Sequence, residues 1–240
     1  MKLAIMQPYF FPYLGYWQLL NFVDRFVIYD DVNYIKGGWI NRNRILINGK
    51  PSYITAPLYQ ASYNKRICDV SLQSSPVWRK KMVKSIENAY RKAPFFSEVF
   101  PIIEKTICYK TENLADFLAY HLKAMAVFLG INTEFVKTSR CYKNHHLTGQ
   151  DRILDICKRE GANEYINLQG GQALYDAEAF RRLGIDLCFM VMQHVPYAQR
   201  AAGFTPCLSL IDALMENGPH GVAQQLDKFD LVTDESLHVQ

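Results

Sequence analysis

The chain has 240 residues, of which 49% are hydrophobic and 21% are charged. These values are near the average of globular proteins and exclude a largely disordered chain. Folding a chain of this length buries about 70% or more of its extended surface, so the core needs neither metal ions nor disulfide bonds. The six cysteines contain no Cys-x-x-Cys pair, which argues against a structural zinc site. We therefore predict no metal site and no cofactor.

No stretch approaches the roughly 18 to 20 consecutive apolar residues that a membrane span requires. Residues 1–8 have too short an apolar run for a signal peptide and lack a small-x-small cleavage site. The sequence therefore predicts a cytoplasmic protein without a membrane span.

The formal net charge of +4 is distributed unevenly along the chain. Residues 32–92 contain twelve Lys or Arg and two acids, Asp69 and Glu87, whereas residues 93–240 contain thirteen basic and eighteen acidic side chains. A concentrated positive field attracts phosphate groups and accelerates the encounter with an anionic ligand. We expect this segment to face a nucleotide or RNA, unless its cations form the solvated face of a helix.

The first third of the chain combines strand and helix patterns. In chain order, these patterns predict a strand over 2–6, a helix over 14–24, a strand over 25–29, and a hairpin with strands over 44–47 and 52–55. The hairpin is centred on Asn48-Gly49, because this dipeptide adopts the positive φ angles that a two-residue turn requires. Residues 76–130 are expected to form a helical insert whose last helix starts at the N-cap Asn113 and ends at the C-cap Gly130.

Strand and helix patterns alternate in the second half. They predict strands over 134–137, 164–168 and 186–192, helices over 151–159 and 176–183, and a helical C-terminal segment over about 205–240. Apolar strands separated by helices imply a parallel sheet covered on both faces. The predicted fold is thus a single α/β domain over residues 1–240, with a Rossmann-like open, mainly parallel sheet, a β-hairpin and the helical insert.

Ligands of such sheets bind beyond the carboxyl ends of the strands, where the strand order reverses, which is usually beside the first strand. This rule selects residues 7–13, 30–33, 138–140, 169–171 and 193–194. We predict that the first strand lies at the centre of the sheet and that Gln7 points into a cleft.

An unusual aromatic turn, QPYFFPYLGY, follows the first strand and is made rigid by two prolines. Gln7, Tyr9 and Tyr13 are its candidate ligand-binding residues, and an aromatic lid that packs against the sheet is the alternative. The layout resembles class I nucleotidyltransferases, in which a His-x-Gly-His tetrad holds a triphosphate at a helix N-terminus. The tetrad here reads Tyr13-Leu14-Gly15-Tyr16, so both imidazoles are replaced and adenylyl transfer would need a diverged site.

The chain contains several longer motifs: residues 5–16, Tyr29-Asp30-Asp31-Val32, KGGWINRNRIL at 36–46, YINLQGGQALY at 165–175, Phe204-Thr205-Pro206 and residues 208–212. These motifs resemble the WbqC-like family, whose bacterial members are associated with O-antigen and related surface polysaccharide gene clusters. The resemblance thus spans nearly the whole chain. It implies a role in modifying an amino sugar, by acyl or aminoacyl transfer.

The segment 36–44 offers many hydrogen-bond donors and suits a diphosphate. Its candidate ligand-binding residues are Lys36, Asn41, Arg42 and Arg44, and Gly37-Gly38 lets backbone approach a ligand closely. If a strand starts here, alternation places Arg42 and Arg44 on one face and Asn41 and Asn43 on the other, so only one pair can line a site. An exposed polar strand is the alternative.

Three further residues are candidate catalytic groups. Asp30 and Asp31 end the second strand and suit a general base or a hydroxyl acceptor, while His145 follows a basic loop and suits a general base. Catalysis is predicted to depend on Asp30 or Asp31 rather than on a cysteine, and a capping or solvated role of this pair is the alternative. Gln169, Gly170 and Gly171 are expected to cradle a phosphate or sugar hydroxyl with backbone N–H groups, unless the glycines only serve packing.

Together these features predict a soluble transferase acting on a nucleotide-linked amino sugar, with acyl or aminoacyl (for example glycyl) transfer to the sugar amine. Aminoacyl-tRNA is a candidate donor, because RNA binding would use the basic segment. Two alternatives stay open: a non-catalytic sugar-nucleotide or RNA binding module, and a diverged nucleotidyltransferase or ATP-dependent ligase. The sequence leaves the sugar, the donor and the oligomeric state undetermined.

Overall fold

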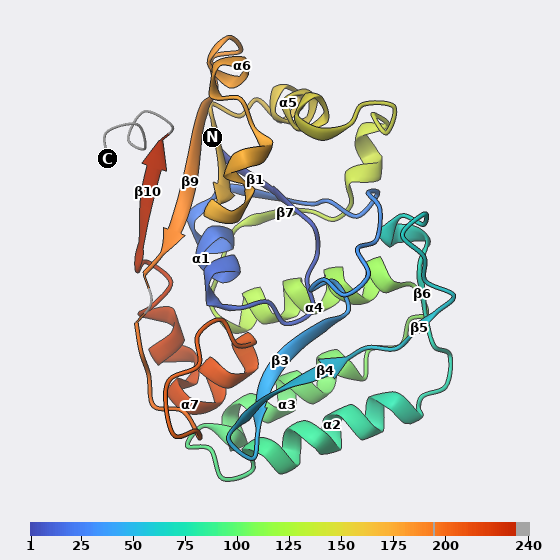
Figure 1. Cartoon of the computed structure of the whole chain (residues 1–240), viewed down its shortest axis with the longest axis vertical. Coiled ribbons are helices and arrows are strands. Elements are labelled where there is room, and N and C mark those ends of the chain that lie inside the picture. The colour runs from blue at the N-terminus through green and yellow to red at the C-terminus, as the bar shows by residue number, and fades with distance from the viewer. Residues whose placement is uncertain (194, 234–240) are drawn as a thin grey trace.

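A computed structural model describes residues 1–193 and 195–233 (Figure 1). Its central sheet consists of β1 (Lys2–Met6), β2 (Arg25–Ile28), β7 (Glu134–Val136), β8 (Glu164–Leu168), β9 (Asp186–Met192) and β10 (Phe229–Thr233). The strand order is β10-β9-β8-β1-β2-β7, and all neighbours are parallel except the antiparallel pair β9 and β10. The predicted mainly parallel, Rossmann-like sheet is confirmed.

The strand order reverses next to β1. The chain proceeds from β1 to β2 and β7 on one side, and then returns to place β8 and β9 on the other side. The first strand therefore lies inside the sheet, as predicted, and the crevice expected of this topology lies between the carboxyl ends of β1 and β8.

Helices cover both faces of the sheet because successive strand residues point to opposite sides. On one face, Ala4 packs in a core with Leu19 and Leu20 of α1 (Leu14–Phe22). This core extends to α4 (Leu114–Phe128) and α7 (Leu210–Ala223). On the other face, Leu3 packs with Ile156 of α5 (Gly149–Glu160) and with residues of α6 (Ala177–Arg181).

The predicted hairpin consists of β3 (Arg42–Ile47) and β4 (Lys50–Thr55), and it extends in front of α2 and α3 (Figure 1). Asn48 and Gly49 have φ angles of 52° and 74°, which confirms the turn. A second antiparallel pair, β5 (Leu58–Tyr59) and β6 (Ser71–Leu72), follows it and is not predicted by the sequence patterns.

Three helices occupy most of residues 76–130, namely α2 (Val77–Tyr90), α3 (Phe96–Ile107) and α4. The Asn113 side chain accepts a hydrogen bond from the Asp116 N–H at 3.0 Å, which confirms the predicted N-cap of α4. The predicted C-cap is wrong by one residue: Leu129 is the C-cap, and Gly130 follows it with a φ angle of 72°. Short 3₁₀ helices form at Ile67–Asp69, Ser139–Tyr142 and Gln169–Leu174.

The C-terminal segment differs from the helical prediction. Helix α7 is kinked at Gly218, which has a φ angle of 69° and is followed by Pro219. After the helix, β10 pairs antiparallel with β9 at the edge of the sheet. Sequence patterns did not predict this strand, because its pairing depends on a partner that lies about 40 residues earlier in the chain. In the described part of the chain, no helix has the length and apolar character to cross a membrane.

Candidate functional site

A cavity of about 490 Å³ opens where the strand order reverses. Its walls come from the residues that end β1 and β8, the aromatic turn after β1, the loop before β3, and α5. The lining residues are Ile5, Met6, Gln7, Tyr9, Tyr13, Tyr29, Ile35, Trp39, Ile153, Asn167, Leu168, Gly170, Gly171, Leu174 and Tyr175. The structure thus brings together five of the predicted ligand-binding residues: Gln7, Tyr9, Tyr13, Gly170 and Gly171.

The cavity combines aromatic walls with amide groups. Tyr9, Tyr13 and Trp39 supply ring surfaces on the side of the turn and the hairpin, and Tyr175 supplies one from beyond β8. Burial raises the pKa of Tyr9, and burial together with neighbouring Cys207 and Tyr9 raises the pKa of Tyr13 to about 12. These hydroxyl groups therefore stay protonated near neutral pH and are uncharged hydrogen-bonding groups. A pocket of this size and lining suits a ligand with polar rings.

The side-chain amides of Asn167 and Gln7, which both line the cavity, differ in the hydrogen bonds that they make within the protein. The Asn167 amide donates to the Tyr165 hydroxyl at 3.1 Å and the Tyr175 hydroxyl at 3.0 Å, and its oxygen accepts from the Leu168 N–H at 2.7 Å. The Gln7 amide makes no hydrogen bond to any residue that the structure describes. Asn167 is therefore positioned by the fold, whereas the Gln7 amide is available to a ligand.

Gly171 lies where the chain passes close to Asn167. A Cβ atom at this position would come within 3.1 to 3.3 Å of the Asn167 amide atoms, whereas nothing lies within 4 Å of one at Gly170. Packing thus explains Gly171, and Gly170 borders open space at the cavity. Gln169 is exposed and does not line the cavity.

The aromatic turn is fixed from three distant parts of the chain. The Phe11 N–H donates to His121 Nε2 of α4 at 3.0 Å, and Asn43 of β3 donates to the Phe10 and Phe11 carbonyls at 3.1 and 2.7 Å. Ser209, before α7, donates to the Phe11 carbonyl at 2.9 Å. Phe10 and Phe11 are fully buried and pack in the core. Tyr9 and Tyr13, on either side of them in sequence, line the cavity.

Acid is expected to weaken this turn through His121. Full burial lowers the pKa of His121 to about 3, while the unfolded chain has a value near 6.5. The contribution of neutral His121 is therefore complete above pH 6.5 and is lost as the pH falls toward 3, by up to about 1.4 kcal/mol per pH unit. Between pH 7 and pH 5, wild type should lose about 2 kcal/mol more unfolding free energy than His121→Gln, which keeps an acceptor that does not titrate. Urea unfolding at both pH values measures this, and parallel losses would contradict it.

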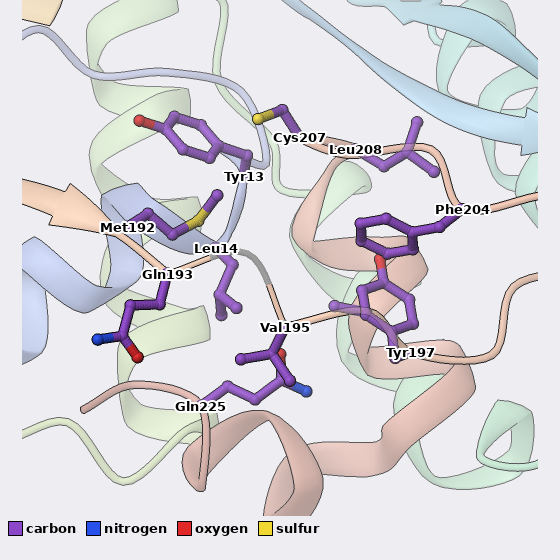
Figure 2. A pocket seen from close by; sticks show the side chains of 11 residues that line it. Tyr13, Leu14, Met192, Gln193, Val195, Tyr197, Phe204, Cys207, Leu208 and Gln225 are labelled. Carbon is purple, nitrogen blue, oxygen red and sulfur yellow. The ribbon is translucent and has the colours of Figure 1, made fainter. Parts of the chain in front are cut away.

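A second, much smaller pocket of about 30 Å³ lies beside Tyr13. Figure 2 shows its lining side chains, which come from the start of α1, the end of β9 and the segment before α7. Gln193, a predicted strand-end residue, lines this pocket, and its neighbour His194 lies outside the described residues. The volume is about that of one water molecule, so this pocket is too small for a sugar or a nucleotide.

The hairpin confirms the predicted alternation and shows which pair points inward. Asn41 is buried and bonds the Tyr34 hydroxyl and the Ala56 carbonyl, so the structure does not bring it to the cavity. Arg42 and Arg44 point outward. Arg42 donates to the carbonyls of Gly37 and Gly38, and its guanidinium lies 4.3 Å from the centre of the Tyr53 ring.

Arg44 makes fewer side-chain interactions than Arg42. Its guanidinium lies 5.7 Å from the centre of the Trp39 ring, and its buried Nε has no hydrogen-bond partner among the described residues. Trp39 lines the cavity, so this cation lies near one wall of the cavity without lining it. Lys36 is exposed in the same loop.

Two of the predicted catalytic residues, Asp30 and Asp31, follow β2. Asp30 is buried and accepts hydrogen bonds from the Thr138 hydroxyl at 2.8 Å and the Ser139 N–H at 3.0 Å. It does not line the 490 Å³ cavity or the neighbouring 310 Å³ cavity described below. Burial raises its pKa, although the hydrogen bond from Thr138 opposes the shift. The Asp31 carboxylate forms a buried ion pair with Arg152 at 2.5 Å and accepts from the Ser139 hydroxyl.

Asp31 and His145 line a separate cavity of about 310 Å³, which also includes Arg66 and Arg152. Tyr29 lines both this cavity and the larger one, so the two adjoin at its side chain. Within residues 1–193 and 195–233, no group of three or more His, Cys, Asp or Glu side chains is arranged to hold a metal ion.

Sequence reasoning missed four aromatic or amide side chains of the main cavity: Tyr29, Trp39, Asn167 and Tyr175. Tyr29 directly follows β2, so the strand-end rule would have selected it if the strand had been ended one residue earlier. Asn167 lies within β8, and no local signal distinguishes it from a packed strand residue. Trp39 and Tyr175 reach the cavity only through the tertiary structure.

Fold and cavity together define a Rossmann-like α/β protein with a cavity at the switch point of the sheet. The chain belongs to the WbqC-like protein family, whose family model matches residues 7–224. The uncharacterized protein Rv1507c of Mycobacterium tuberculosis is 28% identical over 221 residues, which cover 90% of this chain and 94% of that relative. No solved structure matches the chain.

Proposed function

We propose that the protein is a transferase of bacterial surface polysaccharide (O-antigen) biosynthesis that binds a nucleotide-linked amino sugar in the 490 Å³ cavity. The reaction is transfer of an acyl or aminoacyl group, for example glycyl, to the sugar amine. One observation carries the proposal: aromatic rings, the free Gln7 amide and the backbone of Gly170 converge at the switch point of a Rossmann-like sheet.

The charges around the cavity fit a ligand with a diphosphate. Aromatic side chains and amides line the inside, where an uncharged sugar or base would lie. Arg44 lies near Trp39, which lines the cavity, and Lys36 is exposed in the preceding loop. Arg44 therefore serves as the clamp for phosphate oxygens, because its planar guanidinium can donate two hydrogen bonds at once. Arg42 shapes the loop through its bonds to Gly37 and Gly38.

The proposed reaction needs a base beside the sugar amine. The amine nitrogen attacks the acyl carbonyl carbon, an amide C–N bond forms, and the bond from that carbon to the donor's oxygen or sulfur breaks. The proton lost by the amine passes to the base and then to the leaving group. Of the three candidate bases, His145 is exposed and has no hydrogen bond within the described residues, whereas Asp30 and Asp31 already accept several. We assign proton transfer to His145, which lines the 310 Å³ cavity that adjoins the sugar cavity at Tyr29, and a positioning role to the two aspartates.

Binding is tested by calorimetry and by ligand-dependent thermal stabilisation. The panel contains UDP-, GDP- and dTDP-linked amino sugars, coenzyme A and ATP, because a ligand that binds the native state raises the unfolding midpoint. The proposal expects stabilisation by one class of nucleotide sugar. A response to ATP alone would instead support the diverged nucleotidyltransferase or ligase.

Gln7→Ala is expected to weaken binding of the responding nucleotide sugar by roughly tenfold, since about 1.4 kcal/mol corresponds to one hydrogen bond to a neutral amide. Gln224→Ala serves as the matched control, because Gln224 is exposed on the far end of α7 and lines neither cavity. Calorimetric titration of both variants measures the difference. Equal affinities of wild type and Gln7→Ala would place the ligand elsewhere.

A non-catalytic binding module is the second candidate. It is favoured by the internal engagement of Asp30 and Asp31, which take up most of their acceptor capacity within the fold. Mass spectrometry of the responding amino sugar, after incubation with an activated acyl donor, separates the two candidates. An amide product that His145→Ala no longer forms supports the transferase, whereas binding without any product supports the module.

A further inference from the structure

We infer that the outer face of the β3–β4 hairpin binds a single-stranded segment of RNA. The surface consists of Trp39, Arg42, Arg44 and Tyr53, and we call it the hairpin face. The narrower statement that this RNA carries the acyl group rests on the proposed function. The binding itself does not depend on it.

The hairpin face contains two exposed aromatic rings. Trp39 is 39% exposed and Tyr53 is 52% exposed, and their ring centres lie 6.4 Å apart at an angle of 30°. Both rings are therefore partly exposed next to each other, and the Arg42 guanidinium lies over the Tyr53 ring. Adjacent exposed rings are the platforms on which unpaired bases stack, whatever their sequence.

Two arginines alternate with these rings. Arg42 lies over Tyr53 and Arg44 lies near Trp39, at 4.3 and 5.7 Å from the ring centres. A nucleic-acid strand likewise alternates planar bases with phosphates, so rings and guanidinium groups of the hairpin face match its repeating chemistry. Among the described residues, neither Arg42 nor Arg44 forms an ion pair with a carboxylate, so the fold leaves both charges uncompensated.

The segment that contains the hairpin face is basic and lacks acidic residues. Residues 33–68 contain Lys36, Arg42, Arg44, Lys50, Lys65 and Arg66 and not one Asp or Glu. Lys36 and Lys50 are exposed at the two ends of the hairpin region. Such a field attracts a polyanion, and stacking rings distinguish a single nucleic-acid strand from a membrane surface.

The hairpin face continues into the cavity. Trp39 belongs to both, and Ile35 of the same loop also lines the cavity. The end of a strand bound on the hairpin face is thus directed toward the place proposed for the sugar amine. An acyl ester on a terminal ribose hydroxyl would supply the leaving oxygen, which is why we choose RNA over DNA.

Fluorescence anisotropy with a labelled single-stranded RNA of about 12 nucleotides tests the inference, since sites on such platforms cover roughly 4 to 16 nucleotides. Trp39→Ala and Tyr53→Ala should each weaken binding about 5- to 100-fold, the effect of losing one stacked base. Tyr63→Ala is the control, because Tyr63 is 68% exposed in the connection between β5 and β6, outside the hairpin face. Arg44→Ala should lower the salt slope of log K by about 0.7, and Arg182→Ala, a paired surface arginine, should not.

Each outcome decides between alternatives. RNA affinity that is absent at low salt, or unchanged in Trp39→Ala and Tyr53→Ala, overturns the inference. Equal affinity for DNA of the same sequence overturns the choice of RNA, and stronger binding to anionic lipid vesicles assigns the face to a membrane. Tyr53 does not line the cavity, so Tyr53→Ala should retain nucleotide-sugar affinity in calorimetry. RNA binding without nucleotide-sugar binding would therefore support this inference and contradict the proposed function.

Discussion

Asp31→Asn should destabilise the fold by about 3 to 5 kcal/mol, because it leaves the Arg152 guanidinium buried without its charge partner. The ion pair is 2.5 Å long, and both side chains are at least 96% buried. Arg152 also donates to the Asp31 carbonyl and to Asn144, so the pair joins the end of β2 to α5 and the loop before it. Loss of the pair should therefore loosen the wall that carries His145.

Urea unfolding, followed by circular dichroism at pH 7, measures this effect. Asp69→Asn is the matched control, because Asp69 pairs with Arg66 at 2.7 Å but both side chains are more than 40% exposed. Exposed pairs of this kind contribute about 1 kcal/mol or less. Similar unfolding free energies for the two variants would contradict a structural role for the Asp31–Arg152 pair. The double variant Asp31→Asn/Arg152→Met should recover part of the loss, because it removes the unpaired charge.

Asn43→Ala is expected to cost about 3 kcal/mol of unfolding free energy, since it removes partners from buried backbone groups. The Asn43 side chain, 3% exposed, donates to the carbonyls of Phe10 and Phe11, and its oxygen accepts from the Arg44 N–H at 2.8 Å. It thereby connects the aromatic turn of the cavity to the hairpin. The same variant should also weaken ligand binding at the cavity, because Tyr9 and Tyr13 flank the two carbonyls.

Thermal and urea unfolding measure the stability change, and calorimetry measures the ligand affinity. Asn21→Ala is the control, because Asn21 makes one exposed side-chain bond to Asp227 at 3.3 Å. It should change the unfolding free energy by about 0.5 kcal/mol or less. A loss below 1 kcal/mol in Asn43→Ala would show that water or a shifted backbone satisfies the freed groups.

These effects share a feature: the side chains that hold the site in place come from parts of the chain far apart in sequence. Phe11 and His121 are 110 residues apart, Asp31 and Arg152 are 121 apart, and Phe11 and Ser209 are 198 apart. Another buried group, Asp212, accepts from the hydroxyls of Tyr90 and Tyr197 at 2.7 and 2.8 Å. Tyr90 also accepts the Leu46 N–H at 3.1 Å, so α2, α7 and β3 are joined behind the hairpin face.

The sequence alone determined the elements whose signals are local. Strands β1, β8 and β9 have the predicted bounds because each is a continuous apolar run between turn residues. The Asn48-Gly49 turn and the Asn113 cap follow from backbone preferences of single residues. The strand-end rule then selected Gln7 and the segment 169–171 beside the cavity, because topology fixes where the carboxyl ends of parallel strands meet.

Only the tertiary structure decided the rest. Alternation showed that the two asparagines and the two arginines of β3 lie on opposite faces, but the packing of the aromatic turn against Asn43 decided which face is inside. Strand β10 depends on the free edge of β9. The ion pair of Asp31 with Arg152 depends on contacts between distant segments, and so do the positions of Trp39 and Tyr175 at the cavity. No window of local sequence contains these contacts.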